Sequence, residues 1–329
     1  MRIPGIKTAK TFSRWLQARL LGGALILGYH RVADVTRDTY EVCVTPDHFS
    51  EHMEMVNKYA HPIALAELAQ YLKAGSLPPK SVAVTFDDGY VDNLYNAKPI
   101  LEKHEIPATV FVCTGYAGRE FWWDELERLV MSSRADMGAL RFRVGESQFA
   151  WNQPKGSVDA GADVRRKFCR ALYNFLLTLD VEEQNQSMST IHTWSGVSSQ
   201  DATSRTLTHE ELLQLVDGGL IEIGAHTQHH PMLPQLSLER QTEEILSSKQ
   251  DLEMWLGRQI DGFAYPNGKV NENAKRIVRE AGFAFACTSL HDVIRPGSDR
   301  LELRRFWQRD VDGDRFMRGL RLWVKMGRN

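Results

Sequence analysis

Cysteine is scarce in this sequence, and no long apolar run occurs in it. The 329 residues include four cysteines, at positions 43, 113, 169 and 287. They form neither a close-spaced metal pair nor a disulfide framework, which is the usage expected in a reducing compartment. The apolar stretch at residues 20–27 is far shorter than the roughly 20 residues that a membrane-spanning helix needs. No internal repeat or low-complexity tract is evident, so we expect a single globular protein.

The amino terminus looks like a signal peptide only superficially. Several basic residues precede the apolar stretch 20–27, but this stretch leads directly into Tyr29 and His30 without a small-residue cleavage site. Cleavage there would remove a strand that carries a candidate catalytic residue. We therefore predict a cytoplasmic protein.

The net charge is only −2, yet both ends of the chain are basic. No acidic residue precedes Asp34, and residues 315–329 contain basic residues and no acidic ones. At helical spacing, each end of the chain would form a helix with one apolar face. The face at the amino-terminal end contains Phe12, Trp15, Leu16 and Leu20, and the face at the carboxy-terminal end contains Phe316, Leu320, Trp323 and Val324. Such helices suit either an anionic membrane surface, here the inner face, or packing on the protein core. No basic groove with interleaved aromatics appears elsewhere, so nucleic acid is not an expected partner.

Two adjacent carboxylates follow an apolar strand. The run at residues 81–86 has the β-forming residues of a buried parallel strand, and it ends on Asp87, Asp88 and Gly89. Gly89 permits a sharp turn. Both carboxylates therefore fall at the carboxyl end of a strand, where α/β proteins build their sites.

A second polar cluster follows another apolar strand, at residues 221–225. His226 and His230 are four residues apart, so on a helical turn both imidazoles would reach one face, whereas His229 would point elsewhere. Neutral imidazole is the commonest side-chain ligand for zinc-like ions. The two strand ends together indicate a metal site.

The segments Thr85-Phe86-Asp87-Asp88-Gly89 and His226-Thr227-Gln228-His229-His230 resemble the first two motifs of the polysaccharide deacetylases, the chitin deacetylase-like carbohydrate esterases. This resemblance implies that Asp87 is the general base and that Asp88, His226 and His230 are the three metal ligands. One carboxylate and two imidazoles leave open positions for water and a substrate oxygen. Zinc suits this donor set best, and cobalt, nickel, manganese and iron are also compatible with it.

The third motif is matched imperfectly by Phe263-Ala264-Tyr265-Pro266-Asn267-Gly268. Many family members have an arginine where this chain has Ala264, and an aromatic residue where it has Asn267. We expect a backbone N–H near Asn267 to act as an oxyanion donor and Tyr265 to contact substrate. Arg304 or Arg305 could replace the missing arginine, but we interpret the pair as surface charges at a strand end.

The candidate general acid is His30, at the end of the apolar strand 24–29. The resemblance extends to the circularly permuted exopolysaccharide deacetylases, a branch that has a similar Tyr-His strand end early in the chain. There the histidine would protonate the leaving amine. His291 is the alternative acid.

Strand-like runs alternate with amphipathic segments along the chain. We expect strands at about 24–29, 81–86, 108–112, 220–225, 261–265, 283–288 and 301–306, and helices that start at Thr45-Pro46, at a capping box on Thr208 and after Asn271. This alternation predicts a parallel α/β sheet, and the resemblance selects a distorted, incomplete (β/α) barrel. One catalytic domain would span 1–329, with a large insertion at about 118–206, after the fourth strand, that caps the cleft. Trp123 of this insertion could stack on a sugar ring, although tryptophan pairs more often anchor a core or an interface.

The expected function is a metal-dependent hydrolase that removes N-acetyl groups from an amino sugar in a glycan or glycan precursor. Deformylation or O-acetyl ester cleavage on a lipid- or nucleotide-linked saccharide is the enzymatic alternative, because it uses the same site. A carbohydrate-binding protein with a relict site is the non-enzymatic alternative.

Overall fold

The computed structural model describes residues 23–151, 161–198 and 204–326, the side chains of 322–326 excepted. Its residues form two compact units. The first contains Val42–Ala117 and Leu207–Asn329 together with the chain before Val35, and the second contains Val35–Glu41 and Gly118–Thr206. The second unit thus spans the segment that the sequence marks as an insertion, and it adds a short loop, residues 35–41, that the sequence does not indicate.

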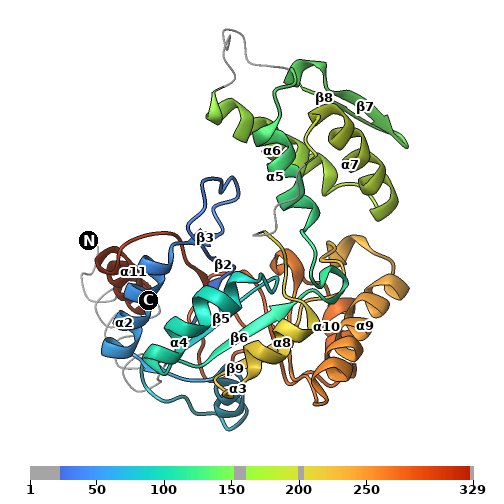
Figure 1. Ribbon diagram of the computed structural model, residues 1–329. Helices are drawn as coiled ribbons and strands as arrows, with labels where there is room; N and C mark the ends of the chain where they lie inside the picture. The colour runs from blue at the N-terminus through green and yellow to red at the C-terminus, as the bar shows by residue number, and fades with distance from the viewer. Residues whose placement is uncertain (1–22, 152–160, 199–203, 327–329) are drawn as a thin grey trace, which may run out of the picture. The chain divides into compact units, whose positions relative to one another are not determined.

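The first unit is built around an eight-stranded parallel sheet (Figure 1). The strand order is β11-β10-β9-β6-β5-β1-β12, and β4 pairs with β5 outside this path. The strands are β1 (Leu25–Tyr29), β4 (His61–Pro62), β5 (Ser81–Phe86), β6 (Ala108–Val112), β9 (Ile221–Ala225), β10 (Gly262–Ala264), β11 (Phe285–Cys287) and β12 (Phe306–Trp307). In chain order β6 is the fourth strand of this sheet, and the second unit follows it, as predicted.

The segment before β12 links the two edges of the sheet. Leu303 makes a parallel bridge to Cys287 of β11, and Phe306 pairs with Leu27 of β1. The sheet therefore curls into a distorted barrel, which confirms the expected fold class. Only the end of the strand predicted at 301–306 is regular, because Leu303 and Phe306 bond to different neighbours.

Alternate residues of the strands enter two different cores. Val82, Val84 and Phe86 of β5 pack in the larger core, whereas Ala83 packs in a smaller core with Phe111. All six residues of β5 are buried. A strand buried on both faces requires an almost continuous apolar run, which is why the sequence pattern located it to the residue.

Helices connect the strands of this unit. They are α2 (Pro46–Tyr59), α3 (Leu65–Lys73), α4 (Lys98–His104), α8 (His209–Val216), α9 (Leu238–Leu256), α10 (Glu272–Glu280) and α11 (Gly313–Met326), with short turns η1 (Asn93–Ala97), η2 (Thr114–Tyr116), η4 (Leu233–Gln235) and η5 (Pro266–Gly268). The three predicted starts are confirmed: Pro46 opens α2, Thr208 and Glu211 form a reciprocal capping box on α8, and the Asn271 side chain caps α10. Beside this sheet, β2 (Arg31–Val32) pairs with β3 (Cys43–Val44).

The second unit contains α5 (Trp122–Ser132), η3 (Met137–Ala139), the antiparallel hairpin of β7 (Arg141–Val144) and β8 (Ser147–Ala150), α6 (Ala162–Leu176) and α7 (Val181–Ser195). Its aromatic residues form its core. Trp123 is only 8% exposed and stacks on Phe121 with ring centroids 4.2 Å apart. This packing fits an aromatic core residue, and contact of Trp123 with a sugar stays a prediction. The loop 35–41 is fastened there, since the Thr39 N–H donates to Glu127 and the Thr39 carbonyl accepts from Arg170.

The carboxy-terminal helix α11 packs on the core. Phe316 and Leu320 are buried, and Phe316 stacks on His52 of α2 at 4.1 Å between ring centroids. Two residues of the carboxy-terminal apolar face, Phe316 and Leu320, therefore pack in the protein interior rather than facing a membrane. The amino-terminal face, with Phe12, Trp15, Leu16 and Leu20, lies outside the described residues. Among the helices that are described, none is both long and apolar enough to cross a bilayer.

Candidate functional site

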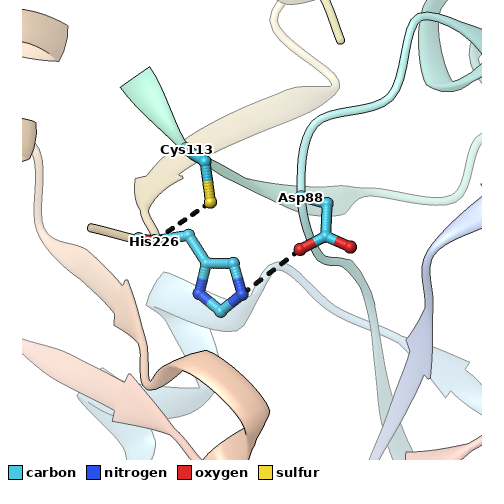
Figure 2. A group of neighbouring side chains, drawn as sticks. All are labelled: Asp88, Cys113 and His226. Carbon is cyan, nitrogen blue, oxygen red and sulfur yellow. Dashed lines mark hydrogen bonds and ion pairs between the residues drawn. The ribbon is translucent and has the colours of Figure 1, made fainter. Parts of the chain in front are cut away.

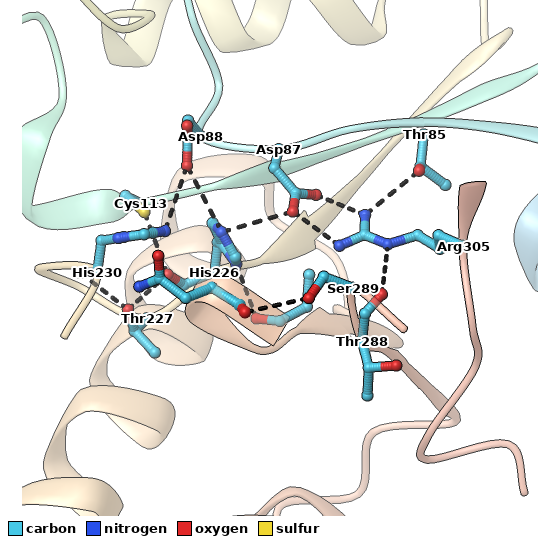
Figure 3. A network of polar contacts seen from close by, with 12 residues as sticks. Thr85, Asp87, Asp88, Cys113, His226, Thr227, His230, Thr288, Ser289 and Arg305 are labelled. Atoms are coloured by element: carbon cyan, nitrogen blue, oxygen red, sulfur yellow. Dashed lines mark hydrogen bonds and ion pairs between the residues drawn. The ribbon is translucent and has the colours of Figure 1, made fainter. Parts of the chain in front are cut away.

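The polar residues singled out in the sequence gather at one edge of the sheet. Asp87 and Asp88 follow β5, and His226 follows β9 directly. Both strands pair with β6 in parallel, so their carboxyl ends meet at the same edge. Figure 3 shows these side chains in one polar network.

The Asp88 carboxylate lies against two imidazoles. Its Oδ1 atom is 3.5 Å from Nε2 of His226 and 3.6 Å from Nε2 of His230. Ligand atoms at about 2.0–2.2 Å from a zinc ion stand roughly 3–3.5 Å apart. The donor set therefore fits a divalent ion held by Asp88, His226 and His230.

The loop that carries the two histidines is not helical, contrary to the expected helical turn. Thr227 and His230 have φ of 65° and 55°, in the left-handed region. The Thr227 hydroxyl donates to the His226 carbonyl and accepts from the His230 N–H at 3.0 Å. Both imidazoles therefore face Asp88 through a tight turn rather than through helical spacing.

Backbone strain is concentrated at this edge. Four of the seven described non-glycine residues with positive φ belong to it: Asp88, Thr227, His230 and Asn267. Each such residue costs about 1–3 kcal/mol, and strain of this kind clusters where a site requires an exact geometry. Gly89 turns the chain after the carboxylates with a φ of 74°, and a side chain there would also crowd Val112.

Both candidate ligand histidines are held neutral. Burial lowers the pKa of His226, and it lowers that of His230 well below the usual value, with the neighbouring His226 adding to the effect. His226 Nδ1 lies 2.7 Å from the Ala264 carbonyl, which can only accept, so the ring proton sits on Nδ1. Its Nε2 lone pair is thus directed toward Asp88, as a metal-binding imidazole requires.

Arg305 is the partner of Asp87. Its guanidinium donates two parallel hydrogen bonds to the carboxylate, at 2.6 and 2.7 Å, and the side chain is fully buried. The interpretation of Arg304 and Arg305 as a surface pair is therefore wrong for Arg305. Arg304 is the exposed member, and it pairs with Asp292 at 3.3 Å.

The ion pair of Asp87 and Arg305 determines the charge of the Asp87 carboxyl group. Burial alone would raise the pKa of Asp87, but Arg305 outweighs it and, with His226, lowers this pKa to about 2. The Arg305 Nε–H also donates to the Thr288 carbonyl at 3.0 Å. Asp87 is therefore an ionised carboxylate with a fixed orientation.

His30 lies in the same electrostatic field. Burial lowers its pKa to about 4 against the opposing effect of Asp87, so the ring is neutral at neutral pH. It stacks on Trp307 with ring centroids 4.5 Å apart, and its carbonyl accepts from the Asn93 side chain at 2.9 Å. His291, the alternative acid, is exposed and lies near Phe306.

The third motif contributes Asn267 but not the side chain of Tyr265. Tyr265 is completely buried, its hydroxyl donates to the Leu301 carbonyl and its N–H donates to Cys287. The prediction that Tyr265 contacts substrate is therefore corrected, because it is a core residue. In Asn267, the buried side-chain Nδ2 has no hydrogen-bond partner among the described residues.

Cys113 was not predicted to belong to the site, yet its sulfur lies beside the candidate ligands Asp88 and His226 (Figure 2). Ligand atoms of Asp88, Cys113 and His226 all lie within 4.8 Å of one another. The thiol donates to the His226 carbonyl at 3.1 Å, and burial raises its pKa well above the usual value. In this protonated state Cys113 is a hydrogen-bond donor to the end of β9, and its sulfur also lies where a metal ligand could stand.

The sequence did contain a signal for Arg305. Leu301, Leu303 and Arg305 alternate with the more exposed Glu302 and Arg304, which is the period of a strand with one buried face. An arginine in phase with two buried leucines needs a buried carboxylate as partner.

Known proteins resemble this chain in sequence and in fold. The family model for polysaccharide deacetylase matches residues 74–138 and 167–286. A poly-β-1,6-N-acetyl-D-glucosamine N-deacetylase of Staphylococcus aureus is 33% identical over an alignment of 110 residues, and the alignment covers 30% of this chain and 38% of that protein. The match thus spans well under half of the curated relative.

Two solved structures share the fold. The deacetylase PplD of Streptococcus pyogenes, in complex with acetate, has a TM-score of 0.60 at 19% identity and covers 91% of this chain and 98% of its own. IcaB from Ammonifex degensii has a TM-score of 0.59 at 21% identity and covers 92% and 97%. With the family model matching more than half of its residues, the chain belongs to the polysaccharide deacetylase family.

Proposed function

We propose that this protein is a metal-dependent hydrolase that removes N-acetyl groups from the amino sugars of a polysaccharide. The observation that carries the proposal is the meeting of two adjacent carboxylates with different partners. Asp87 is paired with Arg305, whereas Asp88 faces His226 and His230. Membership of the deacetylase family and the name of the S. aureus relative support this substrate class.

The candidate ligands are Asp88, His226 and His230, and zinc suits two imidazoles and one carboxylate best. A divalent ion in this position would polarise the acetyl carbonyl and lower the pKa of a water molecule. Asp87 would accept a proton from that water, because Arg305 keeps it ionised and fixes its oxygens. The new C–O bond forms at the acetyl carbon, the amide C–N bond between that carbon and the nitrogen then breaks, and the nitrogen, still bonded to the sugar, takes up a proton.

The proposed roles of Asn267 and His30 concern the acyl oxygen and the amine. Asn267 offers its backbone N–H and its side-chain Nδ2 as donors to the developing oxyanion. His30 is neutral at neutral pH, so the proton that it would give to the leaving nitrogen must be one gained during the reaction. Acetate and a free amine are the products.

The proposal is tested by assaying free acetate and new primary amines. The purified protein would be incubated with β-1,6-linked N-acetylglucosamine oligomers, a nucleotide-linked N-acetyl sugar, a lipid-linked one and an O-acetylated glycan. We expect stoichiometric acetate and amine from the oligomers, loss of both on chelation, and recovery with zinc or cobalt. Acetate without amine would identify an esterase, and no acetate from any substrate would overturn the proposal.

We expect Asp88→Ala, His226→Ala and His230→Ala each to abolish stoichiometric metal binding, because two remaining ligands hold a divalent ion poorly. Metal content after dialysis measures this. His291→Ala is the matched control and should retain the metal, since His291 is exposed. Wild-type metal content in all three variants would rule out this ligand set.

For Asn267 we expect Asn267→Gly to lower kcat by about 100-fold with little change in KM, because one oxyanion donor is lost. Glycine keeps the backbone N–H and accepts the φ of 54° without strain. Steady-state acetate release measures the effect. An unchanged kcat would show that the Asn267 side chain is not an oxyanion donor, and the backbone N–H would remain the candidate.

A further inference from the structure

The turn that carries the two histidines is bonded to a buried carboxylate of α9. Glu244 is 3% exposed, and one of its oxygens accepts from the N–H groups of Gln228 and His229, at 3.0 and 2.9 Å. The other oxygen lies 2.8 Å from Nδ1 of His229. A single carboxylate therefore binds Gln228 and His229, the two residues that directly precede His230.

A second carboxylate of the same helix extends this attachment. Asp251 lies seven residues, or about two turns, after Glu244, so both face the same side. It accepts from the Gln228 side chain at 3.0 Å and from the Thr114 hydroxyl at 2.7 Å. The turn also contacts η2, because the Gly115 N–H donates to the Gln228 carbonyl and a side chain at Gly115 would lie 2.7 Å from that oxygen.

These contacts offset the backbone strain of the turn. Thr227 and His230 have left-handed φ, and neither is glycine. Without an acceptor, the N–H groups of Gln228 and His229 would turn toward water, and the two residues could relax to ordinary φ values. His230 would then move away from Asp88.

We propose that Glu244 is a positioning residue for metal binding, which holds the strained His226–His230 turn in the geometry that brings both imidazoles to Asp88. This rests on the proposed function in that the ion is the one proposed for the deacetylase site. Glu244 touches neither substrate nor ion. Glu244 acts through backbone N–H groups of the turn. The usual partner of a metal-binding histidine instead accepts a hydrogen bond from the ring N–H of that histidine.

The test compares Glu244→Ala and Glu244→Gln with Glu211→Ala. Glu211 is a matched control, because it is also buried on a helix and accepts a backbone N–H, that of Thr208, but in the cap of α8. Zinc affinity would be measured by chelator competition, thermal midpoints in the metal-free protein, and amide exchange over residues 226–230 without metal. We expect Glu244→Ala to weaken zinc binding about 10- to 100-fold and to speed exchange in the turn.

Glu244→Gln retains an acceptor oxygen for the two N–H groups and should recover most of the affinity. Glu211→Ala should lower the thermal midpoint with unchanged zinc affinity and unchanged exchange at 226–230. The inference is overturned if Glu244→Ala binds zinc as the wild type does, or if Glu211→Ala loses as much affinity for the same loss of stability. Failure of the proposed function looks different, since the wild-type protein itself would then bind no zinc, while the exchange comparison still reports whether Glu244 holds the turn.

Discussion

The Asp87→Asn protein should keep its metal and lose its turnover, by at least about 100-fold. Asparagine has the shape of the aspartate but cannot accept the proton of water, and Asp87 is not among the proposed ligands. Acetate release under saturating substrate, with metal content measured on the same sample, provides the comparison.

Asp92→Asn is the matched control for this experiment. Asp92 is also a buried carboxylate paired with an arginine, since Arg31 Nε lies 2.8 Å from it. Both variants leave a buried guanidinium opposite a neutral amide, so both should lose stability. Only Asp87→Asn should lose activity on the scale of a missing base, and full activity in that variant would eliminate the role assigned to Asp87.

The second large effect concerns stability. Arg305→Met should destabilise the metal-free protein by about 3–5 kcal/mol, because removing one member of a buried ion pair leaves the other charge without compensation. Arg305 is fully buried and the Asp87 side chain is 5% exposed, so water cannot replace the lost guanidinium. Urea unfolding monitored by circular dichroism measures the loss.

The double variant Asp87→Asn, Arg305→Met separates the ion pair from packing. Its destabilisation should be smaller than the sum of the two single losses, because neither buried charge remains. If the losses simply add, the pair contributes no interaction energy and Arg305 matters only for its volume. Turnover should fall in both variants that lack Asp87.

Much of the fold could be predicted because its strands are buried on both faces. The run at 81–86 and that at 108–112 have the bounds of β5 and β6, since a doubly buried strand needs apolar residues throughout. The segment at 301–306 was harder to predict, because it bonds to β11 through Leu303 and to β1 through Phe306. Such a change of partner depends on the curl of the sheet, and no local pattern encodes it.

Some residues of the candidate site could be located from the sequence and others could not. Asp87, Asp88 and His226 could be located because each directly follows a predictable strand. Arg305 was misjudged, because its partner lies 218 residues away and charge next to a strand end usually faces solvent. Tyr265 was assigned to substrate by residue type, but its ring is completely buried and its hydroxyl is bonded to the Leu301 carbonyl.

The position of Arg305 in the closing segment of the sheet has a consequence for the order of folding. During synthesis Asp87 leaves the ribosome long before Arg305, so the carboxylate has no counter-charge until the chain has grown by another 218 residues. The loop between them is long, and its closure entropy must be overcome before the pair can form. The base of the proposed reaction thus reaches its final orientation only when Leu303 and Phe306 dock on the two sheet edges. A chain that stalls before this step would contain both histidines and Asp88 but would be a poor hydrolase, so maturation of activity should report completion of the barrel.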